Sequence, residues 1–393
     1  MRRPPRATST EAATGPPREA PAGVFLARPE PPPQGRPLAV KDLFDTAGLT
    51  TTYGSAIFRD HVPQRTAEAV LRLEAGGWAN VGKTNLHEFA YGVTSQNPHF
   101  GDVPNPVAPG RVAGGSSGGN AAALALGLAE GALGSDSGGS IRIPAACCAI
   151  AGFKPGFGLV PVDGCFPLAP SFDHAGPMAD RVGGCVGLMR ALAPERDWDP
   201  PIDSLDEVEV GVAWTADAEP LIGARVEEAA RLLPRRQAVD LPPPTGTTHA
   251  FMREIAETHH SLFAARGAEY GANVRTKVER CLAVTDAQAS AAQARRAAYR
   301  ELLAETFGRV DLLLTPTMPT VPPSVGADEL ERRERMTAFT FPFNVAGAPA
   351  LAVPCGRAEG GLPASAQLVG PPGADALVLA AGELLERRLR GIR

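Results

Sequence analysis

The chain has 393 residues, of which 44% are hydrophobic and 21% are charged, which is typical of a globular protein with a large core. Its formal net charge of -5 and the lack of a long apolar run argue against a broad nucleic-acid surface and a membrane-spanning helix. The six cysteines form no C-x-x-C pair and have no histidine at zinc spacing, so we expect free thiols, no metal and a cytoplasmic protein.

Residues 1–35 are rich in Pro, Ala and Arg and lack the apolar run of a secretory signal, which predicts a disordered lead-in. Order is expected to begin near Pro37, in PLAVKDLFDTAG. The next pattern, TAEAVLRLEAGG at 66–77, predicts a helix capped by Thr66 and ended by the glycine pair. WANV at 78–81 then predicts a short buried strand.

The Gly/Ser-rich stretch GGSSGGN leads into an Ala/Leu helix, AAALALGLAEG, and a second Gly/Ser loop, GSDSGGSIRIPAA, follows. Residues 224–307 are mostly helical in pattern. DLLLTPT, APALAVPCG and ASAQLVG predict strands, and DALVLAAGELLERRLR predicts a closing helix. Strands that alternate with helices predict an α/β architecture.

Two short motifs propose incompatible functions. GWANVGKT at 77–84 fits the phosphate-loop pattern, but its predicted helix precedes the first glycine and its strand lies inside the variable positions, so nucleotide binding is disfavoured. GGSSG at 114–118 fits the esterase elbow, with Ser116 as nucleophile. His174 is the only plausible partner histidine, and a Ser-His-Asp esterase therefore stays open.

The two Gly/Ser loops flank one short Ala-rich helix, and a chain that folds back between them would bring Ser116 or Ser117 near Ser140. The glycines before Ser140 let backbone N–H groups turn toward one point, as an oxyanion site requires. The chain also has only four lysines, Lys41, Lys83, Lys154 and Lys277. Each is a candidate for a task that arginine cannot fill, because lysine can lose its proton when it is desolvated.

The combined motif AGGSSGGNAAALALG and GSDSGGSIRIPAACCAIAGFKP strongly resembles the amidase signature family. The resemblance extends to AVKDLFDTAG, VGKTNLHEF, DLLLTPT and APALAVPCG, and it weakens between about Cys185 and Val274. It implies an α/β amidase signature fold with a mixed, mostly parallel central sheet covered by helices on both faces. One domain would span residues 36–393, with a variable helical region at about 186–300.

The resemblance also implies a serine–cis-serine–lysine relay. Matched by position, Lys41 is the base, Ser116 is the relay with a cis peptide bond to Gly115, and Ser140 is the nucleophile. A neutral Lys41 at pH 7 needs its pKa lowered from ~10.4 by roughly three units, for which burial is the expected cause. Nearby carboxylates of Asp42 and Asp45 would oppose this, so we expect them to point away.

Several further residues are assigned from the same resemblance and from their positions in the loops. The oxyanion is expected to meet the backbone N–H groups of Ser137, Gly138, Gly139 and Ser140. Supporting roles are predicted for Ser117 in the relay and for an Asp136–Arg142 pair that fixes the loop. The substrate-binding residues are predicted to be Ala90, Tyr91 and Gly92, with Asp173 and residues 341–344 as weaker pocket candidates.

The implied activity is hydrolysis of a carboxylic amide to an acid and an amine or ammonia through an acyl-enzyme, with ester or carbamate cleavage as side activities. A catalytically silent scaffold would be expected to lose Lys41, Ser116 or Ser140, and all three are present. The glutaminase component of a tRNA-dependent amidotransferase is an alternative, although the short N-terminus and reduced middle region favour a free-standing amidase.

The expected partner is a small-molecule amide, with no direct nucleic acid, no membrane and no cofactor. The oligomeric state is left open, with a homodimer among the alternatives. Apart from Arg142, which already has a predicted structural role, no charged residue is obviously placed to bind a substrate carboxylate or amine, so a small or aryl amide is the expected substrate.

Overall fold

The computed structural model describes residues 19–391, so residues 1–18 of the predicted lead-in lie outside it. Within the described part, β1 (Phe25–Ala27) pairs antiparallel with β3 (Trp78–Thr84). The side chains of Phe25 and Leu26 pack against the hydrophobic core. The prediction that residues up to 35 lack order is therefore wrong for this strand, because its apolar side chains are partly buried against the core.

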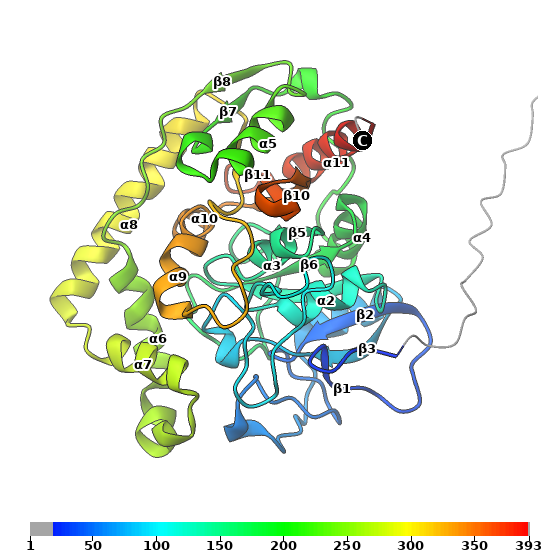
Figure 1. Cartoon of the computed structure of the whole chain (residues 1–393), viewed down its shortest axis with the longest axis vertical. Helices are drawn as coiled ribbons and strands as arrows, with labels where there is room; N and C mark the ends of the chain where they lie inside the picture. Colours follow the sequence, from blue (N-terminus) through cyan, green and yellow to red (C-terminus); the bar gives the residue numbers. More distant parts are fainter. Residues whose placement is uncertain (1–18, 392–393) are drawn as a thin grey trace, which may run out of the picture.

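One eleven-stranded sheet runs through the molecule in the order β1-β3-β2-β4-β6-β5-β10-β11-β9-β7-β8 (Figure 1). The remaining strands are β2 (Arg36–Lys41), β4 (Gly131–Asp136), β5 (Ala151–Lys154), β6 (His174–Ala179), β7 (Val210–Val212), β8 (Arg236–Ala238), β9 (Leu312–Pro316), β10 (Ala350–Arg357) and β11 (Pro363–Val369). The predicted strands WANV, DLLLTPT, APALAVPCG and ASAQLVG are confirmed.

The sheet is mixed, as predicted, but it is not mostly parallel. Six of its ten pairings are antiparallel, and these occupy its centre together with the β1 edge. Parallel neighbours need a crossover of a dozen or more residues. Only residues 358–362 separate β10 from β11, so the chain returns directly and the two strands run antiparallel.

Eleven α-helices lie in the described residues: α1 (Glu68–Ala75), α2 (Gly118–Ala125), α3 (Arg142–Cys147), α4 (Val182–Leu192), α5 (Pro220–Ala230), α6 (Thr248–Arg266), α7 (Ala272–Leu282), α8 (Asp286–Phe307), α9 (Glu329–Thr337), α10 (Phe341–Ala346) and α11 (Asp375–Gly391). The helices predicted at 66–77, after GGSSGGN and at the C-terminal end are confirmed. Thr66 does not cap α1, because its hydroxyl accepts a hydrogen bond from the Ala47 N–H instead. Residues 224–307 are mostly helical, as predicted, although the short strand β8 interrupts them.

Helices cover both faces of the sheet, as predicted, and alternate strand residues show which face each helix covers. Leu38 and Val40 of β2 belong to the cluster that holds the apolar residues of α4 and α11. Ala39, between them, belongs to a second cluster with the alanines of α2 and with Ile143 of α3. The small residues of α2 let this helix lie close to the strands, and its N-terminal end carries one of the two Gly/Ser loops.

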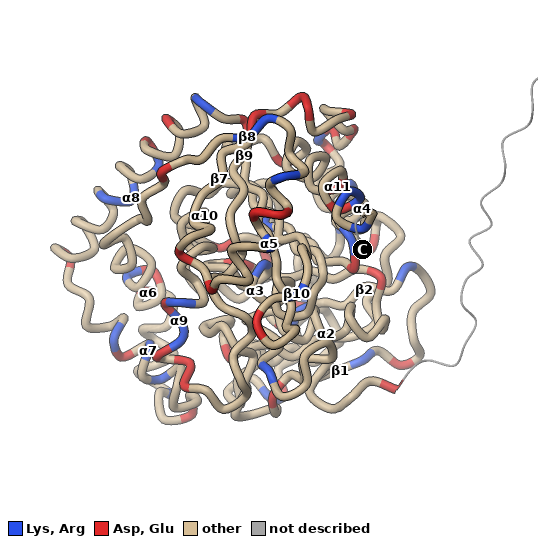
Figure 2. The backbone as a smooth tube through the Cα atoms, turned by 45° about the horizontal axis from the view of Figure 1, so that its top comes forward, with Lys and Arg blue, Asp and Glu red and all other residues tan. Residues whose placement is uncertain are grey.

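Charged residues of both signs are interspersed along the outer helices α7, α8 and α9 (Figure 2). In residues 19–391, no helix combines the length and apolar character needed to cross a bilayer.

Candidate active site

The two Gly/Ser loops meet at the N-terminal end of α2, as the sequence predicted. The N–H of Ser117 donates to the carbonyl of Ser140 at 3.2 Å. At the same end, α2 packs closely on the segment after β3, where a Cβ added to Gly119 would lie 2.4 Å from the Asn85 carbonyl oxygen. Glycine at this position therefore permits the loops to approach each other.

Lys41, the last residue of β2, points into this meeting point. Its Nζ donates to Ser116 Oγ at 2.6 Å and to Ser135 Oγ at 2.8 Å. The peptide bond between Gly115 and Ser116 is cis, as the resemblance implied. Lys41 and Ser116 are fully buried, and Ser135 is 4% exposed. The structure thus gives the lysine two neutral hydroxyl partners in a water-poor site.

Burial lowers the pKa of Lys41 from 10.5 to about 7, and nearby acidic groups oppose the shift only in part. The neighbouring carboxylates point away, as predicted. Asp42 accepts hydrogen bonds from the N–H and hydroxyl of Thr52, at 2.8 and 2.6 Å. Asp45 accepts one from the Tyr53 hydroxyl at 2.7 Å. A substantial fraction of Lys41 is therefore neutral at pH 7 and able to accept a proton.

The predicted pair of Asp136 and Arg142 is confirmed, with 2.9 Å between their charged atoms and both side chains fully buried. Burial alone would raise the pKa of Asp136, but the Arg142 guanidinium holds it well below its usual range. Arg142 also donates to the side chains of Asn344 and Gln367. The carboxylate of Asp136 is thus a fixed, ionised anchor at the base of the loop that carries Ser140.

The oxyanion prediction needs one correction, at Gly139. Its N–H donates to Asp136 Oδ1 at 2.8 Å and is not available for a substrate oxygen, because the Asp136 side chain folds back under the loop. Within residues 19–391, the backbone N–H groups of Ser137, Gly138 and Ser140 have no hydrogen-bond partner. Gly139 has a φ of 131°, and a Cβ there would lie 2.3 Å from Thr340 Oγ1, so this position still requires glycine.

Ser140 is 7% exposed, and its hydroxyl forms no hydrogen bond within the described residues. Catalytic hydrogen bonds are often long or poorly aligned until a substrate is bound, so this observation does not contradict the predicted relay. The hydroxyl of Ser117 donates to the Ser135 carbonyl at 3.3 Å and not to Ser116 or Ser140. Ser117 therefore supports the loop and stands outside the line of proton transfer.

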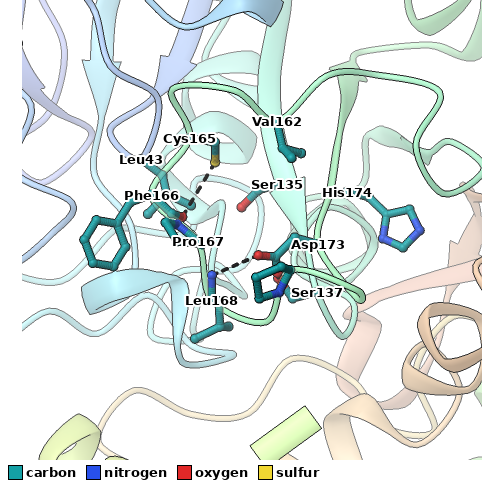
Figure 3. A pocket seen from close by; sticks show the side chains of 11 residues that line it. Leu43, Ser135, Ser137, Val162, Cys165, Phe166, Pro167, Leu168, Asp173 and His174 are labelled. Atoms are coloured by element: carbon teal, nitrogen blue, oxygen red, sulfur yellow. Dashed lines mark hydrogen bonds between the residues drawn. The ribbon is translucent and has the colours of Figure 1, made fainter. Parts of the chain in front are cut away.

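A cavity of about 70 Å³ lies at the end of β4 (Figure 3). Ser135 and Ser137 line it, and the Ser137 hydroxyl donates to the Asp173 carboxylate at 2.5 Å. Because Ser135 also contacts Lys41, the cavity lies close to this lysine. The other lining residues are Leu43, Val162, Cys165, Phe166, Pro167, Leu168, Pro170, Asp173 and His174.

The predicted substrate-binding residues Ala90, Tyr91 and Gly92 do not line this cavity. They are buried, and the Tyr91 carbonyl accepts a hydrogen bond from Lys277. The Tyr91 ring lies 6.3 Å from the ring of Phe251, centroid to centroid, and so packs against helix α6.

Neither of the two competing motifs has the structural context that its pattern requires. The residues of GWANVGKT form a turn and strand β3, in which Lys83 donates to the Phe44 carbonyl at 2.6 Å and lies 3.1 Å from Asp42. His174 is buried, with its Nδ1 2.7 Å from the Phe172 carbonyl and no contact with Ser116. The structure therefore provides neither a phosphate loop nor an esterase triad at these motifs.

Ser135 and Asn344 contact predicted site residues in a way that the sequence did not reveal. Ser135 is the first of three serines in GSDSGGS, but only the pairing of β4 with β2 brings it to Lys41. Asn344 donates to the Asp136 carboxylate at 2.9 Å from a position more than 200 residues away. In residues 19–391, no three His, Cys, Asp or Glu side chains are grouped so that they could hold a metal ion.

Comparison with known proteins gives consistent matches over most of the chain. A family model described as Amidase matches residues 17–379. The chain is 36% identical to the A subunit of glutamyl-tRNA(Gln) amidotransferase from Haloarcula marismortui, covering 90% of this chain and 95% of the relative. It is also 36% identical to the AtzE subunit of 1-carboxybiuret hydrolase from Pseudomonas sp. (strain ADP), covering 91% and 84% respectively.

Solved structures show the same architecture. The A subunit of glutamyl-tRNA(Gln) amidotransferase from Thermotoga maritima superposes with a TM-score of 0.82 at 29% identity, covering 93% of this chain and 87% of that one. A crystal structure described only as an amidase gives a TM-score of 0.82 at 35% identity, covering 90% and 84%.

Proposed function

The chain belongs to the amidase family, whose members hydrolyse amide carbon–nitrogen bonds, and on this premise we propose that Lys41, Ser116 and Ser140 carry out that reaction through an acyl-enzyme. The observation that carries the proposal is the buried 2.6 Å contact between Lys41 Nζ and Ser116 Oγ. It couples a lysine whose pKa is lowered to about 7 to the serine that follows a cis peptide bond.

Neutral Lys41 accepts the proton of Ser116 Oγ, which takes the proton of Ser140 Oγ while that oxygen attacks the substrate carbonyl. The N–H groups of Ser137, Gly138 and Ser140 donate to the negative oxygen of the tetrahedral intermediate. The proton returns along the relay to the amide nitrogen, and the carbon–nitrogen bond breaks. Water, deprotonated by the same relay, then releases the acid and restores Ser140.

The nucleophile is tested by intact-protein mass after treatment with a fluorophosphonate. We expect one adduct on the wild-type chain, none on Ser140→Ala, and much slower labelling of Lys41→Ala. Labelling that persists in Ser140→Ala but is lost in His174→Ala would contradict the relay and favour the esterase hypothesis. Circular dichroism and thermal unfolding of each variant separate a lost nucleophile from a lost fold.

A small-molecule amide is the proposed substrate, with esters and carbamates as side substrates. The second candidate is the glutaminase component of an amidotransferase, because the chain matches 95% of the length of the Haloarcula protein. A panel of L-glutamine, benzamide and phenyl acetate distinguishes the two. Turnover of benzamide by the purified chain supports the free-standing enzyme, whereas turnover of glutamine alone supports the amidotransferase component. Light scattering of the same sample tests whether the chain forms a homodimer.

A further inference from the structure

A second cavity, of about 310 Å³, lies between α6, α9 and α10. Its lining includes the aromatic side chains of Phe251 and Phe341 and the polar side chains of Thr248, Thr337 and Arg333. The remaining lining residues are Pro243, Pro244, Glu334, Ala338 and Pro342.

This cavity borders the oxyanion loop. A Cβ added to Gly138 would lie 3.5 Å from the ring of Phe341, which lines the cavity. The neighbouring Thr340 hydroxyl donates to the Gly138 carbonyl at 2.7 Å. A substrate whose carbonyl meets the Gly138 N–H can therefore extend past Phe341 into this space.

Arg333 lines this cavity and, within the described part of the chain, has an unsatisfied hydrogen-bond donor. Its guanidinium makes no hydrogen bond or ion pair with any described residue, and its Nε is buried from solvent. The buried Arg142 and Arg296 differ, because each donates to several oxygen atoms. A buried donor without an acceptor is costly, and a ligand that supplies the acceptor recovers that cost.

The chemistry of Arg333 and its surroundings favours a ligand with a carboxylate group. Its guanidinium carbon lies 5.3 Å from the Tyr91 ring centroid and 5.8 Å from that of Phe251, so two aromatic faces hold the charged group at the cavity. A guanidinium fork matches the two oxygens of a carboxylate.

Two acidic residues also face this region, and neither forms a hydrogen bond or an ion pair with the Arg333 guanidinium. Glu329 lies 3.0 Å from Lys277 and accepts from the Val93 N–H, so its charge already has partners. Glu334 is exposed at the rim of the cavity. Figure 2 shows the resulting mixture of basic and acidic residues along α9.

We propose that Arg333 binds a carboxylate on the substrate, so that the enzyme prefers amides that also carry a carboxylate over the corresponding neutral amides. The proposal rests on the amidase function above. It names a charged residue for substrate recognition where the sequence pointed to none beyond Arg142.

The test compares 4-carbamoylbenzoate with benzamide, two amides that differ by one carboxylate. For wild type we expect a kcat/KM at least about 10-fold higher with 4-carbamoylbenzoate, which is the size of one charge-assisted hydrogen-bonding contact. In Arg333→Gln this preference should be lost through a higher KM for 4-carbamoylbenzoate, while kcat/KM for benzamide changes by less than about 3-fold. Arg333→Lys should recover part of the preference.

Arg332→Gln is the matched control, because Arg332 lies on the same helix but faces a different cleft. It should keep the wild-type preference. Equal losses for both amides in Arg333→Gln, or an unchanged preference, would overturn the proposal.

Calorimetric binding of the two amides to Ser140→Ala gives a readout that does not depend on turnover. Tighter binding of 4-carbamoylbenzoate that disappears in the Ser140→Ala, Arg333→Gln double variant supports the subsite even if neither amide is hydrolysed, in which case the proposed function alone fails. Equal binding of both amides overturns the subsite.

Discussion

Lys41 and Lys83 lie on neighbouring parallel strands, where Lys83 pairs in register with Val40 and Lys41 pairs with Thr84. Both side chains are fully buried. Lys83 lies 3.1 Å from the Asp42 carboxylate, whereas the hydrogen bonds of Lys41 Nζ within residues 19–391 go to the hydroxyls of Ser116 and Ser135. Burial lowers the pKa of both lysines, and Asp42 opposes that effect at Lys83.

We propose that these two equally buried lysines have different roles, and that the group beside each ammonium decides which role it has. An adjacent carboxylate favours the ammonium form and makes a lysine part of the scaffold. Neutral hydroxyls accept hydrogen bonds from the ammonium form of Lys41 but supply no negative charge. This lysine therefore releases its proton more readily than a lysine beside a carboxylate. Lys41 is the proposed base because it lacks the ion-pair partner that Lys83 has.

The largest expected effect comes from removing the base. Lys41→Met should lower kcat/KM by about 10²–10⁴-fold, the usual contribution of a general base. The free energy of unfolding should stay the same or rise, because a buried charge without a counter-ion is removed. Steady-state kinetics and urea unfolding measure the two effects. A strongly destabilised Lys41→Met would mean that this lysine is structural as well.

The converse substitution is expected to affect stability. Lys83→Met leaves Asp42 buried without its cation and should lower the free energy of unfolding by about 3–5 kcal/mol. The kcat per folded molecule should change little. Adding Asp42→Asn to the same chain should restore part of the lost stability. A Lys83→Met protein that is stable but inactive would contradict the assignment of Lys83 to the scaffold.

A third test uses pH. The base works without its proton, so kcat/KM should rise about tenfold per unit below pH 7 and level off above it. Since the pKa of folded Lys41 is lowered to about 7 from 10.5, the unfolded chain binds more protons between these values, and this lysine should make stability increase with pH there. Lys41→Met should remove that contribution. A rate profile that is flat between pH 5 and 8 would exclude Lys41 as the base.

The smallest expected effect is at Ser135. Ser135→Ala removes one hydrogen bond that favours the charged form of Lys41 and should lower kcat by about tenfold. The inflection of the pH–rate profile should move to lower pH, because the pKa of Lys41 falls further. Ser117→Ala is the comparison variant, since its hydroxyl contacts only a backbone carbonyl and should leave the inflection in place. An inflection unmoved in Ser135→Ala would show that its hydroxyl does not tune the base.

The sequence predicted those features that depend on neighbouring residues. Ser116, Ser140 and the Asp136–Arg142 pair lie within two short motifs, so their positions could be assigned before any folding was considered. The long apolar strands and the amphipathic helices could also be predicted from the sequence pattern. The three-residue strands β1, β7 and β8 are too short to show a period, and the direction of each strand depends on its distant neighbours.

The parts of the site that could not be predicted depend on tertiary contacts. Ser135 reaches Lys41 through strand pairing, and Arg333 enters its cavity through the packing of α9 beside α6 and α10. The engagement of the Gly139 N–H depends on a side chain that folds back on its own loop. Neither spacing nor composition carries that information.

The Asp136 anchor has a practical consequence for capturing the enzyme with its substrate. Its pKa is depressed well below the usual range, so its bonds to Arg142 and Gly139 persist at pH 5, where Lys41 holds its proton. With Lys41 as the proposed base, turnover at pH 5 should be slowed about 100-fold, while the loop that carries Ser140 keeps its shape. Crystals grown at that pH and soaked with an amide should retain the unreacted compound, and raising the pH would start turnover in the lattice.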